Sequence, residues 1–136
     1  MRIISTDRLE PLFDTAATRA IEQAAQATLP HHALMARAGL SVARLARALA
    51  PHARCIWVAC GPGNNGGDGL VAAMHLHRWA EGTGLQVVVT HTLGAQVDAA
   101  QLPPDAAQAL TDARSAGVLI QPDPPALFDL AIDALL

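Results

Sequence analysis

The chain has 136 residues, which is enough for one domain of ordinary size. Apolar residues make up 51% of it, so we expect a buried core, yet no apolar run reaches the roughly 18 residues of a membrane span. The net charge is -3 and the basic residues are scattered, which argues against a nucleic-acid-binding surface. The charged N-terminus lacks the apolar stretch of a signal peptide. We therefore expect a cytoplasmic protein with neither nucleic acid nor membrane as a partner.

Two helices are predicted at the start of the chain. Asp14 or Thr15 can cap a helix that runs to about residue 28, because Pro30 prevents its continuation. A second helix is predicted over residues 32–49 and is ended by Pro51. Its apolar side chains recur at helical spacing, and we expect them to form a core stripe: Leu34, Met35, Ala38, Val42, Leu45 and Leu49.

Strands and helices then alternate. The apolar run over residues 54–60, followed at once by glycines, is typical of a parallel strand buried on both faces. The later predicted elements are a helix from residue 70 to about 82, a strand over 85–92, a helix between Pro104 and Gly117, a strand over 118–120 and a strand over 129–136. This order predicts a Rossmann-like three-layer α/β/α sandwich with a mainly parallel sheet, preceded by the two N-terminal helices.

The chain stops on an apolar strand, which would leave an aggregation-prone edge. We therefore expect residues 1–136 to form a single truncated domain whose C-terminal part is missing. Cys55 and Cys60 lie five residues apart on one predicted strand, so they should point to opposite faces and remain free thiols. The six histidines show no metal-ligand spacing, and surface or packing roles are expected for them.

A glycine-rich segment joins the first strand to the next helix, an arrangement that presents backbone N–H groups to an anion. Gly61, Gly63 and Gly66 fit the dinucleotide pattern G-x-G-x-x-G. The acidic residue that an NAD-dependent dehydrogenase would carry at the end of the second strand is absent. There is no Gly-Lys-Ser/Thr sequence either, so a Walker phosphate loop is excluded.

Three polar side chains make this segment more specific than its glycines do. Asn64 and Asn65 each offer an amide nitrogen to a phosphate and an amide oxygen to a hard cation. Asp68 is expected in the first helical turn, where it either complements the helix dipole or contacts a ligand. Residue types alone leave both readings of Asp68 open.

Asp133 is a lone acid within the last apolar strand. Its carboxylate could simply satisfy a neighbouring backbone group. If the strands are ordered 3-2-1-4, however, the last strand lies beside the first at the point where ligands bind in doubly wound sheets. Asp133 would then converge on the same crevice as Asn64 and Asn65.

Residues 61–73 resemble the hallmark of the NAD(P)H-hydrate epimerase family, also called the YjeF N-terminal domain. Residues 34–39 and 129–136 resemble that family's early helical segment and its fourth strand. Ala36 differs from the acidic residue that the family often carries there. The Gly-x-Gly loop that follows the fourth strand in the family is absent from this chain.

The resemblance implies an isomerase that interconverts the R and S forms of hydrated NADH and NADPH. It implies cofactor-binding positions at Asn64, Asn65, Gly66, Gly67 and Asp68, an acid–base residue at Asp133, and a potassium ion held by Asn65 and Asp133. The implied partners are the substrate, a fused or separate NAD(P)H-hydrate dehydratase and a second copy in a homodimer. The chain on its own is expected to be inactive. The alternative is a non-catalytic nucleotide-binding or protein-interaction module of the same fold.

Overall fold

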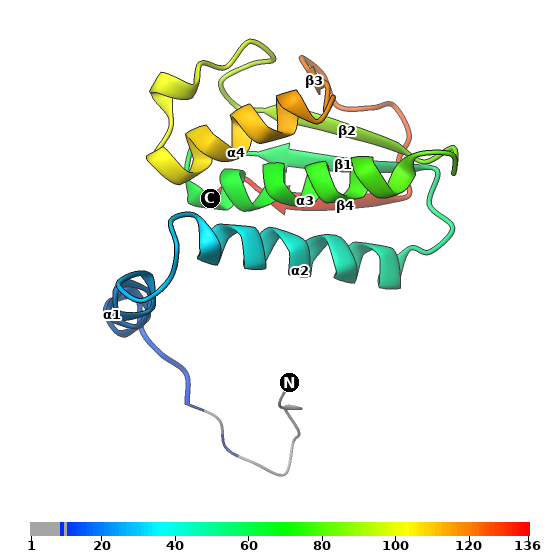
Figure 1. Ribbon diagram of the computed structural model, residues 1–136. Coiled ribbons are helices and arrows are strands. Elements are labelled where there is room, and N and C mark those ends of the chain that lie inside the picture. The colour runs from blue at the N-terminus through cyan, green and yellow to red at the C-terminus, as the bar shows by residue number, and fades with distance from the viewer. Residues whose placement is uncertain (1–8, 10) are drawn as a thin grey trace. The chain divides into compact units, whose positions relative to one another are not determined.

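The computed structural model describes residue 9 and residues 11–136 (Figure 1). The chain divides into two compact units, Met1–His31 and His32–Leu136. In the first unit, helix α1 (Thr15–Gln26) begins after Asp14, whose carboxylate accepts the N–H of Ala17 at 2.8 Å. This confirms the predicted helix and its cap. Among the described residues, no helix combines the length and apolar character needed to cross a membrane.

The second unit is built on a parallel sheet of four strands. In chain order these are β1 (Cys55–Cys60), β2 (Gln86–His91), β3 (Ile120–Gln121) and β4 (Leu130–Ala134). Their spatial order is β3-β2-β1-β4, with every neighbouring pair parallel. The predicted α/β class and the predicted strand order are therefore both confirmed.

Strands β3 and β4 differ most from the bounds that the sequence pattern indicated. The N–H of Val118 donates to the carbonyl of Ala113 at 3.0 Å, which closes the preceding helix, so β3 begins only at Ile120. Strand β4 ends at Ala134 and not at Leu136, because the last two residues leave the ladder with β1. The apolar pattern located both strands but could not show where their hydrogen bonding stops.

Three long helices, α2 (Ala33–Leu49), α3 (Asn64–Ala80) and α4 (Pro104–Ser115), lie on one side of the sheet (Figure 1). Helix α3 is the central one and packs against the strands as well as against both other helices. A short 3-10 helix, η1 (Ala99–Gln101), precedes α4 in the segment predicted as a loop. The unit thus contains the sheet and one of the two expected helical layers.

The side of α2 that faces the core differs from the predicted apolar stripe. Leu45 and Leu49 are 58% and 68% exposed, whereas the buried residues are Met35, Gly39, Ala43 and Ala46. A Cβ at Gly39 would lie only 2.5 Å from Cβ of Val71, so small residues are needed where α2 meets α3. The stripe prediction is confirmed for Met35, and Val42 packs partly buried against the core. It was wrong for Leu45 and Leu49, because close packing of α2 on α3 favours small side chains over the larger apolar ones.

The two faces of the sheet are buried to different degrees. Ile56, Val58 and Cys60 of β1 point toward the helices and are almost completely buried. Trp57 points to the other face, where its Nε1–H donates to the Thr90 hydroxyl at 2.9 Å and its ring contacts Phe128. No helix of the described second unit covers this other face. Cys55 and Cys60 are free and on opposite faces, as predicted.

Asp129 anchors the start of β4 to the start of β1. Its carboxylate accepts the N–H groups of Arg54 at 2.7 Å and Cys55 at 3.0 Å. These bonds hold the pKa of Asp129 below its usual 3.8, and the bond from Cys55 has the largest effect. The resulting stabilisation is complete above the usual pKa and is lost as pH falls through the lowered value of the folded state.

We therefore expect Asp129→Asn to make thermal stability less sensitive to acid. The melting temperatures of wild type and variant should be compared from pH 7 down to about pH 2. The fall below pH 4 should be shallower in the variant, because asparagine has no carboxyl proton to bind. Asp123→Asn, a change at an exposed residue of the preceding loop, is the control. Parallel curves for wild type and Asp129→Asn would contradict this role.

Candidate functional site

The glycine-rich segment is mostly helix in the structure. Only Gly61, Pro62 and Gly63 form the connection from β1, and α3 begins at Asn64. The prediction that the helix opens at Leu70 was wrong. Glycine costs about 1 kcal/mol relative to alanine inside a helix, so propensity alone favours a loop here. Tertiary contacts override that preference.

Those contacts require the absence of side chains. A Cβ at Gly66 would overlap the carbonyl oxygen of Gly61, and a Cβ at Gly61 would overlap the carbonyl oxygen of Leu135. A Cβ at Gly67 would lie 2.5 Å from Cε of Met35 on α2. The glycines therefore let α3 begin directly at the edge of the sheet.

The first turn of α3 has backbone donors that the helix itself does not use. Its N-cap, Gly63, makes no side-chain capping bond, and the first helical hydrogen bond runs from the N–H of Gly67 to the carbonyl of Gly63 at 3.2 Å. Helix geometry leaves the N–H groups of Asn64, Asn65 and Gly66 without an intrahelical acceptor. The side chains of both asparagines are exposed beside them. This turn has the arrangement of an anion-binding helix N-terminus.

Asp68 is not where the sequence predicted it. Because α3 begins at Asn64, Asp68 is its fifth residue and lies in the second turn, and the first turn contains no acid. The interpretation of Asp68 as an acid that complements the helix dipole from the first turn is therefore wrong. Its side chain is half-buried.

The end of β4 lies against the glycine connection. The N–H of Gly61 donates to the carbonyl of Ala134 at 2.8 Å, and Leu135 passes beside Gly61. Asp133 is paired with Ala59 in the ladder, one residue before this bond. The predicted approach of the last strand to the loop is confirmed at the level of the backbone.

The Asp133 side chain is exposed, and its Oδ1 accepts the N–H of Leu135 at 3.1 Å. Asn64, Asn65 and Asp133 thus belong to one edge of the sheet, and no hydrogen bond joins Asp133 to either asparagine among the described residues. No cluster of three histidine, cysteine or acidic side chains suited to a metal occurs in the described part of the chain. An oxygen-donor site made of amide and carboxylate groups is the kind of cation site that these residues can form.

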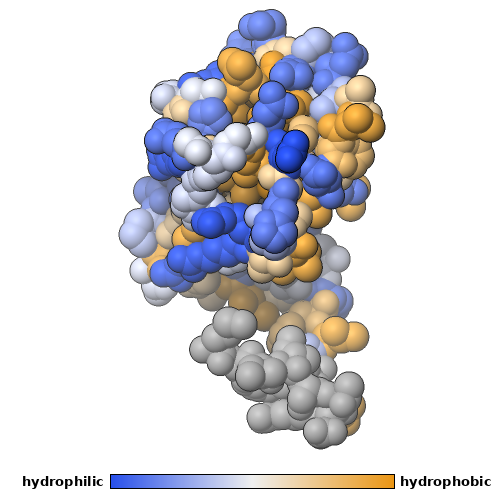
Figure 2. Space-filling view, turned by 90° about the vertical axis from the view of Figure 1, so that its right-hand side faces the viewer, coloured by the Kyte–Doolittle hydropathy of each residue, from blue (hydrophilic) through white to orange (hydrophobic). Residues whose placement is uncertain are grey.

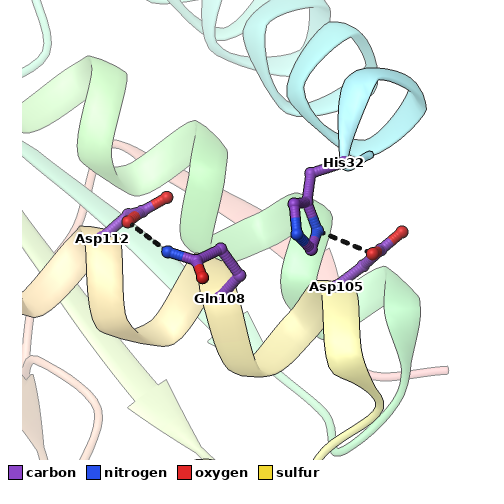
Figure 3. Close-up of polar contacts among 4 residues, drawn as sticks. All are labelled: His32, Asp105, Gln108 and Asp112. Carbon is purple, nitrogen blue, oxygen red and sulfur yellow. Dashed lines mark hydrogen bonds and ion pairs between the residues drawn. The ribbon is translucent and has the colours of Figure 1, made fainter. Parts of the chain in front are cut away.

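A pair of polar side chains links the two helices that flank the first turns of α3. His32, at the N-cap of α2, lies with Nδ1 2.6 Å from Oδ1 of Asp105 in the first turn of α4 (Figure 3). Met35 and Ala106, each a short step further along these helices, both contact the position of Gly67. The pair therefore links α2 and α4 where they enclose the first turns of α3. No sequence pattern predicts the pair, because its members are 73 residues apart.

Cysteine chemistry does not fit this edge. Cys60 is the last residue of β1 and is fully buried, and burial raises the pKa of its thiol to about 12. A thiol with such a pKa is protonated near neutral pH and is a poor nucleophile.

The amino ends of the strands carry a separate hollow. A cavity of about 320 Å³ is lined in part by Arg47, Arg54 and Trp79, with the Arg47 guanidinium 5.1 Å from the Trp79 ring centroid. Figure 2 shows this end of the molecule, where hydrophilic side chains surround apolar ones. Ligands of open parallel sheets bind outside the carboxyl ends of the strands. The edge with the glycine connection is therefore the stronger candidate.

His91 is a further residue at this edge, and no sequence motif points to it. It ends β2, is only 6% exposed and is paired in the ladder with Cys60, the residue before the glycine connection. The available signal was a histidine at the carboxyl end of an otherwise apolar strand. That pattern alone does not distinguish a site residue from a packed one.

Comparison with known proteins identifies the family. The model of the YjeF-related protein N-terminus family matches residues 31–136. The bifunctional NAD(P)H-hydrate repair enzyme Nnr of Coxiella burnetii is 39% identical over 129 residues, which cover 92% of this chain and 25% of that protein. The NAD(P)H-hydrate epimerase of Anopheles darlingi is 64% identical over 44 residues, 32% of this chain and 19% of that protein.

A solved structure has a similar fold. The crystal structure of yeast ynu0, YNL200c, is 26% identical, with a TM-score of 0.55, over 76% of this chain and 44% of that one. The chain spans only about a fifth to a quarter of the length of the two curated relatives. The family match nevertheless covers most of the chain. The protein belongs to the YjeF-related protein N-terminus family.

Proposed function

We propose that the protein is an isomerase that interconverts the R and S forms of hydrated NADH and NADPH. One observation carries the proposal. The hydrogen bond from Gly61 to Ala134 holds a helix N-terminus suited to phosphate beside the strand that carries Asp133. Relatives named for NAD(P)H-hydrate epimerisation or repair support the same activity.

In this proposal the substrate lies over the first turn of α3. The N–H groups of Asn64, Asn65 and Gly66 face a phosphate oxygen, and the asparagine amides provide additional donors. Gly67 contributes by allowing α2 to approach, and Asp68 bounds the site from the second turn. All five residues remain proposed contacts.

Asp133 is proposed as the acid–base residue. The hydrated carbon of the nicotinamide ring bears a hydroxyl group and adjoins a ring nitrogen. As the C–O bond breaks, the Asp133 carboxyl group donates its proton to the departing oxygen, giving water and an iminium-like ring. Water then adds to the other face of the ring and gives a proton back to the carboxylate. An exposed carboxylate beside the loop can reach solvent for this exchange.

Potassium is proposed as the cofactor, held by Asn65 and Asp133. The available donors are amide and carboxylate oxygens, which suit a hard cation better than a thiolate-seeking metal. Both side chains are exposed at the same edge of the sheet. Such an ion supplies a positive charge that offsets the negative charge of the substrate. A dehydratase, fused or separate, and a homodimer stay predictions, as does a cytoplasmic location.

The proposal is tested by following conversion of R-NADHX to S-NADHX with the full-length protein. We expect acceleration over the uncatalysed rate, and a further increase when potassium replaces sodium at equal ionic strength. Equal rates in the two salts would contradict the cation site but not the isomerase. No acceleration in either salt would overturn the isomerase and favour the non-catalytic module.

A further inference from the structure

His91 is the one polar or charged side chain that is buried among the described residues. Its Nδ1 accepts the N–H of Leu93 at 3.1 Å, and its Nε2 is buried without a hydrogen-bond partner in the described part of the chain. A nitrogen that accepts a hydrogen bond carries no proton, so the proton of the neutral ring is on Nε2. Burial lowers the pKa of His91, which keeps the ring neutral near pH 7. Nε2–H is therefore a buried donor, and buried donors rarely lack an acceptor.

The groups around the His91 ring indicate which atom can accept the hydrogen bond from Nε2–H. His91 lies beside Cys60 in the ladder, and the N–H of Thr92 donates to the carbonyl of Cys60 at 3.0 Å. Gly61 is the next residue, and its backbone acts on the pKa of His91 in the opposite direction to burial. The carbonyl of Gly61 is the same group that excludes a side chain at Gly66. The ladder register thus places His91 beside the residue from which the glycine connection starts.

We propose that His91 is a positioning residue for the glycine connection, with Nε2–H directed to the Gly61 peptide so that the first turn of α3 keeps a fixed orientation toward the ligand. The expected effect of His91 on epimerisation rests on the proposed function. Its expected effect on the orientation of the glycine connection does not. A histidine present only for packing would fill the same volume without orienting this peptide.

Two substitutions distinguish the roles of the two ring nitrogens of His91. In His91→Asn the side-chain oxygen can still accept the N–H of Leu93, as in an Asx turn, but no donor reaches the position of Nε2. In His91→Gln the longer side chain brings an amide N–H to that position. The pair compares a polar residue that keeps the turn with one that keeps the donor.

The first readout is amide hydrogen exchange in the ligand-free, full-length protein. The informative N–H groups are those of Gly61 and Gly67, which are bonded to Ala134 and Gly63 on either side of the connection. His91→Asn should speed their exchange about tenfold, as expected when a buried backbone group loses the polar donor directed toward it. His91→Gln should stay within about threefold of wild type. The amide of Val89, within β2, is the internal control for global stability.

The second readout is epimerisation kinetics, where His91→Asn should raise KM about tenfold with a smaller change in kcat, and His91→Gln should restore KM. Unchanged exchange at Gly61 and Gly67 in His91→Asn would overturn the positioning role, and so would equal acceleration at Val89, which indicates global destabilisation. If exchange changes as expected but wild type epimerises nothing, the positioning role stands and the proposed function fails.

Discussion

Replacement of Asp133 with asparagine is expected to lower kcat for epimerisation about 10²–10⁴-fold, the usual contribution of a positioned acid–base group. Asparagine retains an oxygen that can accept the N–H of Leu135, so the end of β4 should keep its conformation. The side chain is exposed, so the substitution removes little buried surface. We therefore expect a melting temperature close to that of wild type. Steady-state kinetics and a thermal melt of the full-length protein measure both quantities.

Asp123→Asn provides the matched control, because it removes one exposed carboxylate from the same unit, in the loop that precedes β4. It should leave kcat within about twofold of wild type, since it alters only the long-range field, which salt screens. If Asp133→Asn retained wild-type turnover, Asp133 could not be the acid–base residue. Equal losses in the two variants would point to net charge and not to a positioned group.

The second large effect is expected on stability. Gly66→Ala introduces a Cβ that overlaps the carbonyl oxygen of Gly61, so backbone must shift. Gly61 is itself held by its hydrogen bond to Ala134, which opposes such a shift. Overpacking typically costs about 1–3 kcal/mol, and the better helix propensity of alanine returns at most about 1 kcal/mol. We expect a net loss of about 2 kcal/mol or more in the free energy of unfolding, measured by urea denaturation. Affinity for the hydrated cofactor should fall as well.

Gly63→Ala is the control within the same connection. A Cβ at Gly63 would meet only the carbonyl oxygen of Leu136, at an ordinary contact distance of 3.6 Å, and its φ of -95° is open to any residue. Alanine is a poorer N-cap than glycine, so a loss of at most about 1 kcal/mol is expected. Comparable free energies of unfolding for Gly66→Ala and wild type would contradict this prediction, because they would show that the backbone can shift at little cost.

The features of the fold that the sequence predicted well are those set by alternation of apolar runs with turns. The four strands, their parallel arrangement and the meeting of β4 with the glycine connection all follow from short apolar runs bounded by turns and from crossover rules. Asp14 was recognised as a cap because its carboxylate needs only local neighbours.

Other features depend on partners that are distant in the sequence. The start of α3 at Asn64 is decided by contacts of Gly66 and Gly67 with β1 and α2, against the local preference of glycine. The face of α2 that is buried depends on the close approach of α2 to α3 at Gly39. The pattern of apolar residues in the sequence does not show this approach. The placement of His91 beside the start of the glycine connection needs the register of β1 with β2. Each of these requires the tertiary structure.

The overlap at Gly61, Gly66 and Gly67 has a consequence for interpreting related proteins. Steric exclusion makes these glycines necessary for the architecture whether or not a reaction takes place nearby. A descendant that had lost its chemistry and become a scaffold would still need them. The residues that distinguish an enzyme from such a descendant are the exposed ones that the fold could do without, namely Asn64, Asn65 and Asp133.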